Sequence, residues 1–205
     1  MKRALFFDLD DTIYPTKSVV DSMYHDLFEL LRGGVNSDTF ENIRKDILTT
    51  PFHVIADRYA LDQKLKDEGL KMSLYMTYDG PMEPFEDYAF TRAIEMDKFL
   101  ITAGYVPLQK SKIKQLGIAE DFNEIFIPDP YRSTLTKTDL FEQIMRKYNY
   151  APDEILVIGD NPETELAAAK TLCIETYLYD YEGKYSPALA NYYGKCYDNL
   201  RDILI

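Results

Sequence analysis

Residues 4–14 read ALFFDLDDTIY, an apolar run that ends abruptly in Asp8, Asp10 and Asp11. The pattern predicts a buried parallel strand that delivers carboxylates to the carboxyl edge of a sheet, where open α/β folds bind ligands. Alternate residues of a strand share a face, so Asp8 and Asp10 can converge on one small site. Two carboxylates at such a short distance repel each other, and a bound cation relieves the repulsion. The alternative is that Asp10 and Asp11 only form a polar turn and cap the next helix.

The size and charge of the chain limit the classes of protein it can belong to. Its 205 residues can form a core domain of about 120 to 140 residues with a smaller inserted one. The net charge of −12 argues against a nucleic-acid partner, because phosphate backbones select basic surfaces. A phosphate-bearing ligand must therefore meet locally placed positive charge.

The N-terminus and the cysteines indicate a cytoplasmic protein without a membrane partner. The apolar run before Asp8 is too short for the core of a signal peptide and far too short to span a bilayer. Cys173 and Cys196 form no CxxC pair, and His25 and His53 are too isolated to make a zinc site with them. We therefore expect two buried thiols in a reducing compartment.

The periodicity of apolar residues changes along the chain and predicts two domains. Residues 16–82 carry apolar residues at helical spacing, broken at Gly33-Gly34 and Pro51 and ended by Pro81 and Pro84, so we expect an all-helical insert there. From residue 86 onward, strands alternate with helices, which is typical of right-handed βαβ units and a parallel sheet. Strands are expected at 98–102, 124–127, 155–158 and 175–179, a helix from Pro162, and a terminal helix docked by Leu200, Ile203 and Leu204. Residues 1–15 and 83–205 would then form the core and 16–82 the insert.

Groups suited to phosphate or metal follow three of these strands. They are Asp8-x-Asp10-x-Thr12, Thr102-Ala103-Gly104, and Gly159-Asp160 with Glu165 downstream, while Lys137 stands at the start of the helix before the last strand. In this order they resemble the four motifs of the haloacid dehalogenase (HAD) superfamily: DxDxT, a strand-terminal Ser or Thr, a Lys and an acidic element. The resemblance covers the whole chain and implies an α/β fold, a three-layer Rossmann-like parallel sheet with an inserted all-helical cap.

The resemblance also implies a role for each of these residues. Asp8 would be the nucleophile that forms an aspartyl-phosphate, and Asp10 would protonate the leaving alcohol and later activate water. Mg²⁺ would be held by the Asp8 carboxylate, the Asp10 backbone carbonyl and Asp160. Thr102, the Ala103 amide and Lys137 would bind the phosphoryl oxygens. Charge supports this assignment independently, since a carboxylate that attacks a phosphate dianion needs a metal and a lysine to offset like-charge repulsion.

Each of these residues also has a purely structural interpretation. Thr102 could satisfy a strand end, Lys137 could be an exposed lysine, and Asp160 could cap a helix. Glu165 stands where the family often has Asp, which leaves open whether it reaches a metal-bound water or orients Lys137. Ala103 replaces a frequent Asn, which removes no reacting group.

The resemblance implies a phosphatase that acts on a small phosphorylated metabolite, such as a nucleotide or a sugar phosphate. The ALFFDLDDTIYP opening and the helical insert look most like the branch with pyrimidine 5′-nucleotidases and related sugar-phosphate phosphatases. Dehalogenation is disfavoured, since family members with that activity lack the second acid, here Asp10. A phosphotransferase or mutase and a catalytically silent binding protein are the alternatives. Cap residues that could contact substrate, or could simply pack or face solvent, are Tyr24, Phe28, Arg58 and Tyr59.

Overall fold

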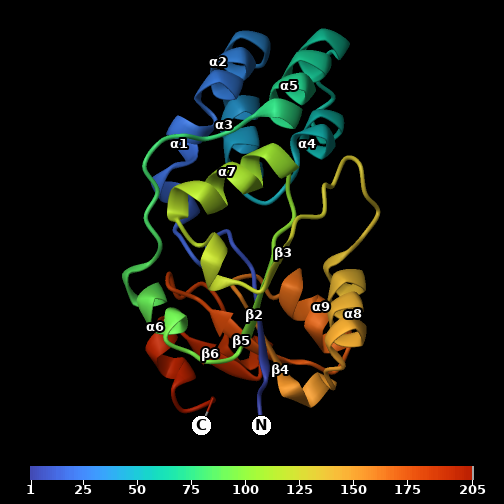
Figure 1. Cartoon of the computed structure of the whole chain (residues 1–205). Helices are drawn as coiled ribbons and strands as arrows, with labels where there is room; N and C mark the ends of the chain where they lie inside the picture. The colour runs from blue at the N-terminus through green and yellow to red at the C-terminus, as the bar shows by residue number, and fades with distance from the viewer. Residues whose placement is uncertain (205) are drawn as a thin grey trace.

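A six-stranded parallel sheet forms the centre of the molecule (Figure 1). In the computed structural model, which describes residues 1–204, the strands pair in the order β3-β2-β1-β4-β5-β6. Their bounds are β1 Ala4–Phe7, β2 Asp97–Ile101, β3 Glu124–Phe126, β4 Ile155–Gly159, β5 Glu175–Tyr179 and β6 Tyr192–Gly194. β1 pairs with β2 on one side and with β4 on the other. The carboxyl ends of three strands that were predicted to bear functional groups are therefore neighbours at one edge.

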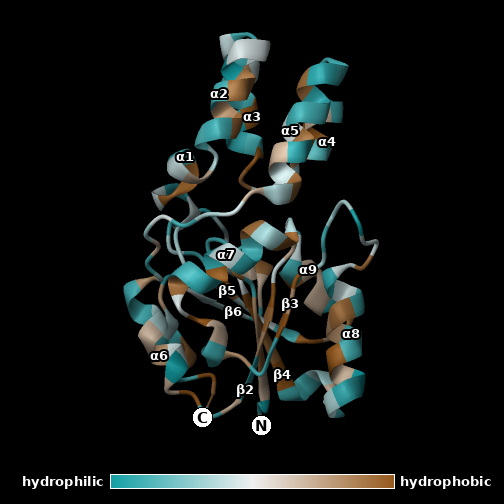
Figure 2. Cartoon of the chain, turned by 45° about the horizontal axis from the view of Figure 1, so that its top comes forward, coloured by the Kyte–Doolittle hydropathy of each residue, from teal (hydrophilic) through white to brown (hydrophobic). Residues whose placement is uncertain are grey.

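Alternation along β1 divides the apolar core between the two faces of the sheet. Leu5 and Phe7 belong to one cluster of buried residues and Phe6 to another, as the two-residue period of a strand requires. Helices α8 (Lys137–Tyr148) and α9 (Glu165–Thr171) cover the Phe6 face, while α6 (Ala89–Arg92) and α7 (Val106–Leu116) lie on the Phe7 face. The strands form the brown centre of Figure 2 between these two layers of helices. The predicted α/β, three-layer Rossmann-like core is confirmed.

Five helices between β1 and β2 gather at one end of the molecule (Figure 1). They are α1 Val20–Met23, α2 His25–Gly34, α3 Ser37–Asp46, α4 Phe52–Arg58 and α5 Gln63–Tyr75. Their inward side chains, such as Leu27, Ile43 and Ile55, form a third buried cluster. The two connecting segments on either side meet where the Phe85 N–H donates to the Ile13 carbonyl at 2.8 Å. The chain thus leaves and re-enters the sheet layer at nearly the same place.

Several local predictions were wrong. β6 was not predicted, and the expected terminal helix is replaced by a 3₁₀ turn at Tyr197–Leu200, although Leu200 is buried as expected. α9 begins at Glu165 instead of Pro162. The remaining 3₁₀ turns are Thr16–Ser18, Glu86–Tyr88, Ala119–Asp121, Pro152–Glu154 and Pro187–Leu189.

The thiols also differ from expectation, because Cys173 is exposed and Cys196 is half-buried; both are free. Within residues 1–204, the longest helices fall short of the length and apolar character needed to cross a bilayer.

Candidate active site

Asp8, Lys137 and Glu165 form a buried ionic triad at the carboxyl end of β1. The Lys137 ammonium lies 2.7 Å from Asp8 Oδ1 and 2.9 Å from Glu165 Oε2. Lys137 is the first residue of α8, whose start is fixed by a capping box between Thr136 and Asp139. Burial alone would lower the pKa of Lys137, but the two carboxylates outweigh it and raise that pKa above its usual range. The Lys137 side chain is only 13% exposed, so it is a largely buried cation held at the sheet edge and not an exposed lysine.

Asp160 adds a third carboxylate to this edge. It follows Gly159 at the end of β4, and single oxygens of Asp8, Asp160 and Glu165 lie within 4.8 Å of one another. Burial, followed by repulsion from Glu165 and Asp8, raises the pKa of Asp160 to about 9. Burial also raises the pKa of Asp8 to about 7, despite the opposing effect of Lys137. α9 has Thr164 at its N-cap position, so Asp160 does not cap that helix.

The donors around Glu165 distinguish it from the other two acids. Its carboxylate accepts hydrogen bonds from the Asn161 N–H at 2.8 Å, from the Thr164 hydroxyl and from Lys137. These partners outweigh the effect of burial and lower the pKa of Glu165. Gly159 leaves room for this arrangement, because a Cβ there would lie 2.3 Å from Glu165 Cγ. The contacts favour Glu165 as the residue that orients Lys137, while Asp8 and Asp160 retain the oxygens that a hard cation such as Mg²⁺ prefers.

Asp10 lies in a second polar network that the sequence did not reveal. Its carboxylate is 2.8 Å from the Lys112 ammonium and 3.0 Å from Gln109 Nε2, and it accepts a hydrogen bond from the Tyr14 hydroxyl. Burial tends to raise the pKa of Asp10, but Lys112 and the two other donors outweigh it and lower that pKa. Gln109 and Lys112 lie on α7, about a hundred positions from Asp10. Spacing along the chain gave no signal for either residue.

Thr102 and Ala103 follow β2 beside this network. Thr102 is buried, and its hydroxyl accepts a hydrogen bond from Gln109 Nε2 at 2.6 Å, so Gln109 joins it to Asp10. Thr102 and Ala103 line one cavity of about 510 Å³ together with Asp8, Asp10, Lys137 and Asp160. The structure therefore brings all six predicted site residues to a single cavity.

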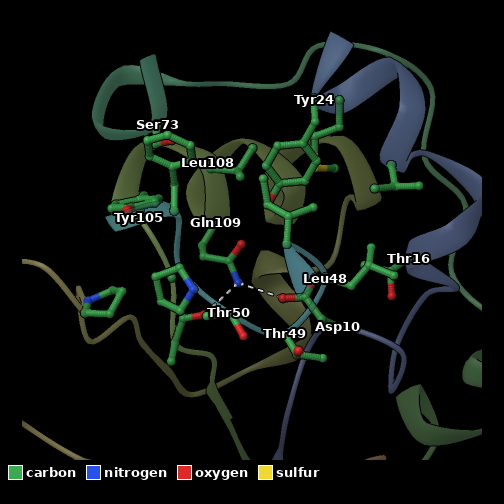
Figure 3. Close-up of a pocket in the computed structure, with 18 of the residues that line it drawn as sticks. Asp10, Thr16, Tyr24, Leu48, Thr49, Thr50, Ser73, Tyr105, Leu108 and Gln109 are labelled. Carbon is green, nitrogen blue, oxygen red and sulfur yellow. Dashed lines mark hydrogen bonds between the residues drawn. The ribbon is translucent and has the colours of Figure 1, made fainter. Parts of the chain in front are cut away.

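A smaller cavity of about 180 Å³ adjoins the larger one at Asp10, and residues of α7 and of the helical segment after β1 line it (Figure 3). It shares Asp10, Leu48, Thr49 and Ala103 with the larger cavity. Tyr24, one of the candidate substrate contacts, lines it.

The other three candidate contacts have structural partners instead. Phe28 packs edge-on against Phe40 inside the helical cluster, and Arg58 and Tyr59 both hydrogen bond to Asp46.

Comparison with known proteins agrees with this fold. Residues 2–172 match the family model of haloacid dehalogenase-like hydrolases. The glyceraldehyde 3-phosphate phosphatase of Pyrococcus furiosus is 22% identical over 199 residues, covering 90% of this chain and 82% of that protein.

Two solved structures share the fold at lower identity. The magnesium-bound HAD-hydrolase YfnB of Bacillus subtilis superposes with a TM-score of 0.70 at 16% identity, covering 99% of this chain and 98% of that one. A protein described as a β-phosphoglucomutase from Thermotoga maritima gives 0.65 at 17% identity, covering 100% and 99%. Because the family model spans most of the sequence, from the first strand to the end of α9, this chain belongs to the haloacid dehalogenase-like hydrolases.

Proposed function

We propose that this enzyme is a Mg²⁺-dependent phosphomonoester hydrolase that acts on a small phosphorylated metabolite through an aspartyl-phosphate at Asp8. The observation that carries the proposal is the pairing of Asp8 with Lys137 in a cavity that also holds Asp10 and Asp160. A carboxylate nucleophile, a second acid and a fixed cation are the parts that phosphoryl transfer needs. The name of the curated relative, a phosphatase of a three-carbon phosphate ester, supports the same activity.

The acidic residues fit a magnesium ion. Asp8 and Asp160 converge within 4.8 Å, and their raised pKa values reflect negative charge that burial leaves poorly compensated. We propose that these two carboxylates and the Asp10 backbone carbonyl hold the ion. A bound Mg²⁺ would supply positive charge for the phosphate oxygens and would favour the ionised forms of both carboxylates.

In the first step, an Asp8 carboxylate oxygen attacks phosphorus while the bond between phosphorus and the ester oxygen breaks. Asp10 reacts from its protonated form, which is the minor one because Lys112 and the other donors lower its pKa, and gives its proton to the departing alcohol oxygen, which leaves an Asp10 carboxylate. Lys137, Thr102 and the Ala103 amide bind the phosphoryl oxygens and stabilise their charge as it redistributes. Glu165 keeps the Lys137 ammonium beside Asp8.

In the second step, the Asp10 carboxylate removes a proton from water as the water oxygen attacks phosphorus. The bond between Asp8 and phosphorus breaks, inorganic phosphate leaves, and Asp10 is protonated again. Lys112 and Tyr14 stabilise the ionised form of Asp10 that this step requires. The net reaction is one water consumed for one alcohol and one phosphate released.

Residues 16–82 act as the cap of this site in our proposal, with residues 1–15 and 83–205 as the catalytic core. Support comes from Leu48 and Thr49, which lie just after α3 and line the same cavity as Asp8 and Lys137. A cover that excludes water protects the aspartyl-phosphate and favours compact substrates. We also propose that the enzyme acts in the cytoplasm.

Phosphate release from p-nitrophenyl phosphate tests the proposal. Asp8→Asn should abolish turnover, and EDTA should abolish it in the wild-type enzyme. Asp10→Asn should still attack this ester, whose leaving group needs little protonation, and should accumulate enzyme that carries one phosphoryl group, visible by intact-mass spectrometry. Near-normal rates in Asp8→Asn would refute nucleophilic catalysis at that residue.

The same preparation separates the two alternative functions. Transfer of phosphate to an added alcohol, in place of free phosphate, would identify a phosphotransferase or mutase. Binding of a phosphometabolite without any phosphate release would identify a silent binding protein.

A further inference from the structure

We propose that the 180 Å³ cavity beside Asp10 binds the leaving group of the substrate and selects a short, uncharged and hydroxylated one, with Thr16 as a specificity-determining residue. This inference rests on the proposed phosphatase activity. It assigns the cavity in Figure 3 to the alcohol part of the ester and the larger cavity to the phosphate.

The position of Asp10 supports this division. Asp10 lines both cavities, whereas Asp8, Lys137 and Asp160 line only the larger one. The group that protonates the leaving oxygen must lie within hydrogen-bond reach of it. A substrate whose phosphorus lies beside Asp8 therefore extends its alcohol part past Asp10, into the smaller cavity.

The volume limits the size of that alcohol. A buried protein cavity of about 150 Å³ accommodates one benzene molecule, or about six non-hydrogen atoms. The cavity beside Asp10, at about 180 Å³, is only slightly larger. A glycerol or glyceraldehyde group has about that many atoms, while a nucleoside has about three times as many and would not be enclosed. The volume therefore favours a short sugar phosphate over the nucleotide suggested by the resemblance to pyrimidine nucleotidases.

One buried hydroxyl on the cavity wall has no partner. Among the buried side-chain oxygens and nitrogens of residues 1–204, those without a hydrogen bond are Thr12 Oγ1 and Thr16 Oγ1, and of these two residues only Thr16 lines the cavity. Thr16 is 7% exposed, so bulk water does not readily satisfy its hydroxyl. A buried polar group normally finds a partner, and a change of the Thr16 χ1 rotamer that turns this hydroxyl into the cavity would let a substrate oxygen provide one. Thr49, Thr50 and Ser73 add further hydroxyls to the same wall.

The charges on the wall argue against an anionic leaving group. Asp10 and Lys112 are the charged side chains that line this cavity, and they neutralise each other at 2.8 Å. A substrate carboxylate would find no unpaired cation there and would lie close to the Asp10 carboxylate, which is unfavourable in a partly buried site. Neutral hydroxyls or a carbonyl match the lining better.

A panel of four esters tests this inference with wild-type enzyme and Mg²⁺: glycerol 3-phosphate, 3-phosphoglycerate, uridine 5′-monophosphate and p-nitrophenyl phosphate. We expect kcat/KM for glycerol 3-phosphate to exceed that for 3-phosphoglycerate and for the nucleotide by at least about tenfold. Equal or higher values for either of those two, with p-nitrophenyl phosphate also hydrolysed, would overturn the assignment of the cavity and leave the phosphatase function standing. No phosphate from any of the four would refute both.

Thr16→Val isolates the role of the hydroxyl, because valine has nearly the same shape. Loss of one hydrogen bond, worth about 1 to 1.5 kcal/mol, should lower the ratio of kcat/KM for glycerol 3-phosphate to that for n-propyl phosphate about five- to tenfold. n-Propyl phosphate has the same carbon chain without the hydroxyls. Thr77→Val, at an exposed threonine outside the walls of this cavity, is the matched control and should leave the ratio unchanged. An unchanged ratio in Thr16→Val would show that Thr16 does not determine specificity.

Discussion

Removing the Lys137 ammonium should destabilise the folded protein strongly, because it leaves two buried carboxylates without their cationic partner. In Lys137→Met, Asp8 loses a partner at 2.7 Å and Glu165 loses one at 2.9 Å. Breaking a buried ion pair by deleting one partner costs about 3–5 kcal/mol, against a total stability of about 5–15 kcal/mol for a domain. With a urea m-value of about 2 to 3 kcal/mol/M, the unfolding midpoint should fall by about 1–2.5 M near pH 8.

The loss should shrink in acid. Lys137 lowers the pKa of Asp8 and of Glu165, so its removal raises both pKa values. In the variant, a fall in pH toward about 5.5 therefore protonates the stranded carboxylates and removes part of the cost. Comparing urea unfolding of the wild-type and variant proteins at the two pH values, in EDTA, measures this effect.

Lys147→Met in the same helix is the matched control. The Lys147 side chain is 59% exposed, and its ion pair with Glu124 is a surface contact, worth less than about 1 kcal/mol. If Lys137→Met lost no more stability than Lys147→Met near pH 8, the triad would not be a buried ionic unit. An equal loss at both pH values would contradict the charge argument.

Two further predictions concern ionisation at the site. Because the folded-state pKa values of Asp8 and Asp160 are raised to about 7 and about 9, the metal-free protein should lose stability as pH rises from the ordinary Asp pKa of about 3.9 up to those values. Mg²⁺ should therefore raise the melting temperature more near pH 9 than near pH 6; an equal rise at both would contradict the proposed ligands. Lys112→Met should raise the pKa of Asp10 and move the basic limb of kcat/KM for an alkyl phosphate to higher pH. An unmoved limb would count against Asp10 as the proton donor.

The sequence predicts the strands of the sheet correctly where their residues are apolar on both faces. Runs such as Ile155 to Ile158 and the alternation with helices predicted five parallel strands to within a residue or two at most ends. β6 was not predicted because its three residues, Tyr192–Gly194, carry no aliphatic run. They form a strand through their pairing with β5. Pro162 is compatible with a helix start, yet α9 begins only at Glu165, where the preceding turn hydrogen bonds to the Glu165 carboxylate.

Some residues of the candidate site could likewise be predicted from the sequence, and others could not. Asp8, Thr102 and Asp160 could be predicted because the topology of parallel strands brings strand ends to one edge. Lys112 and Gln109 could not, because they approach Asp10 only through the packing of α7 across the sheet end, and a helical lysine is ordinarily solvent-exposed.

The backbone hydrogen bond between Phe85 and Ile13 has a consequence for how such an enzyme can change. This bond joins the segment that leaves the sheet after β1 to the segment that returns toward β2. The residues between Ile13 and Phe85 therefore form an insertion whose two ends lie next to each other. Segments of other lengths could be grafted there without shifting β1 or β2, since insertion is best tolerated where the chain ends lie close together. Substrate choice and phosphate chemistry can thus diversify separately in one polypeptide.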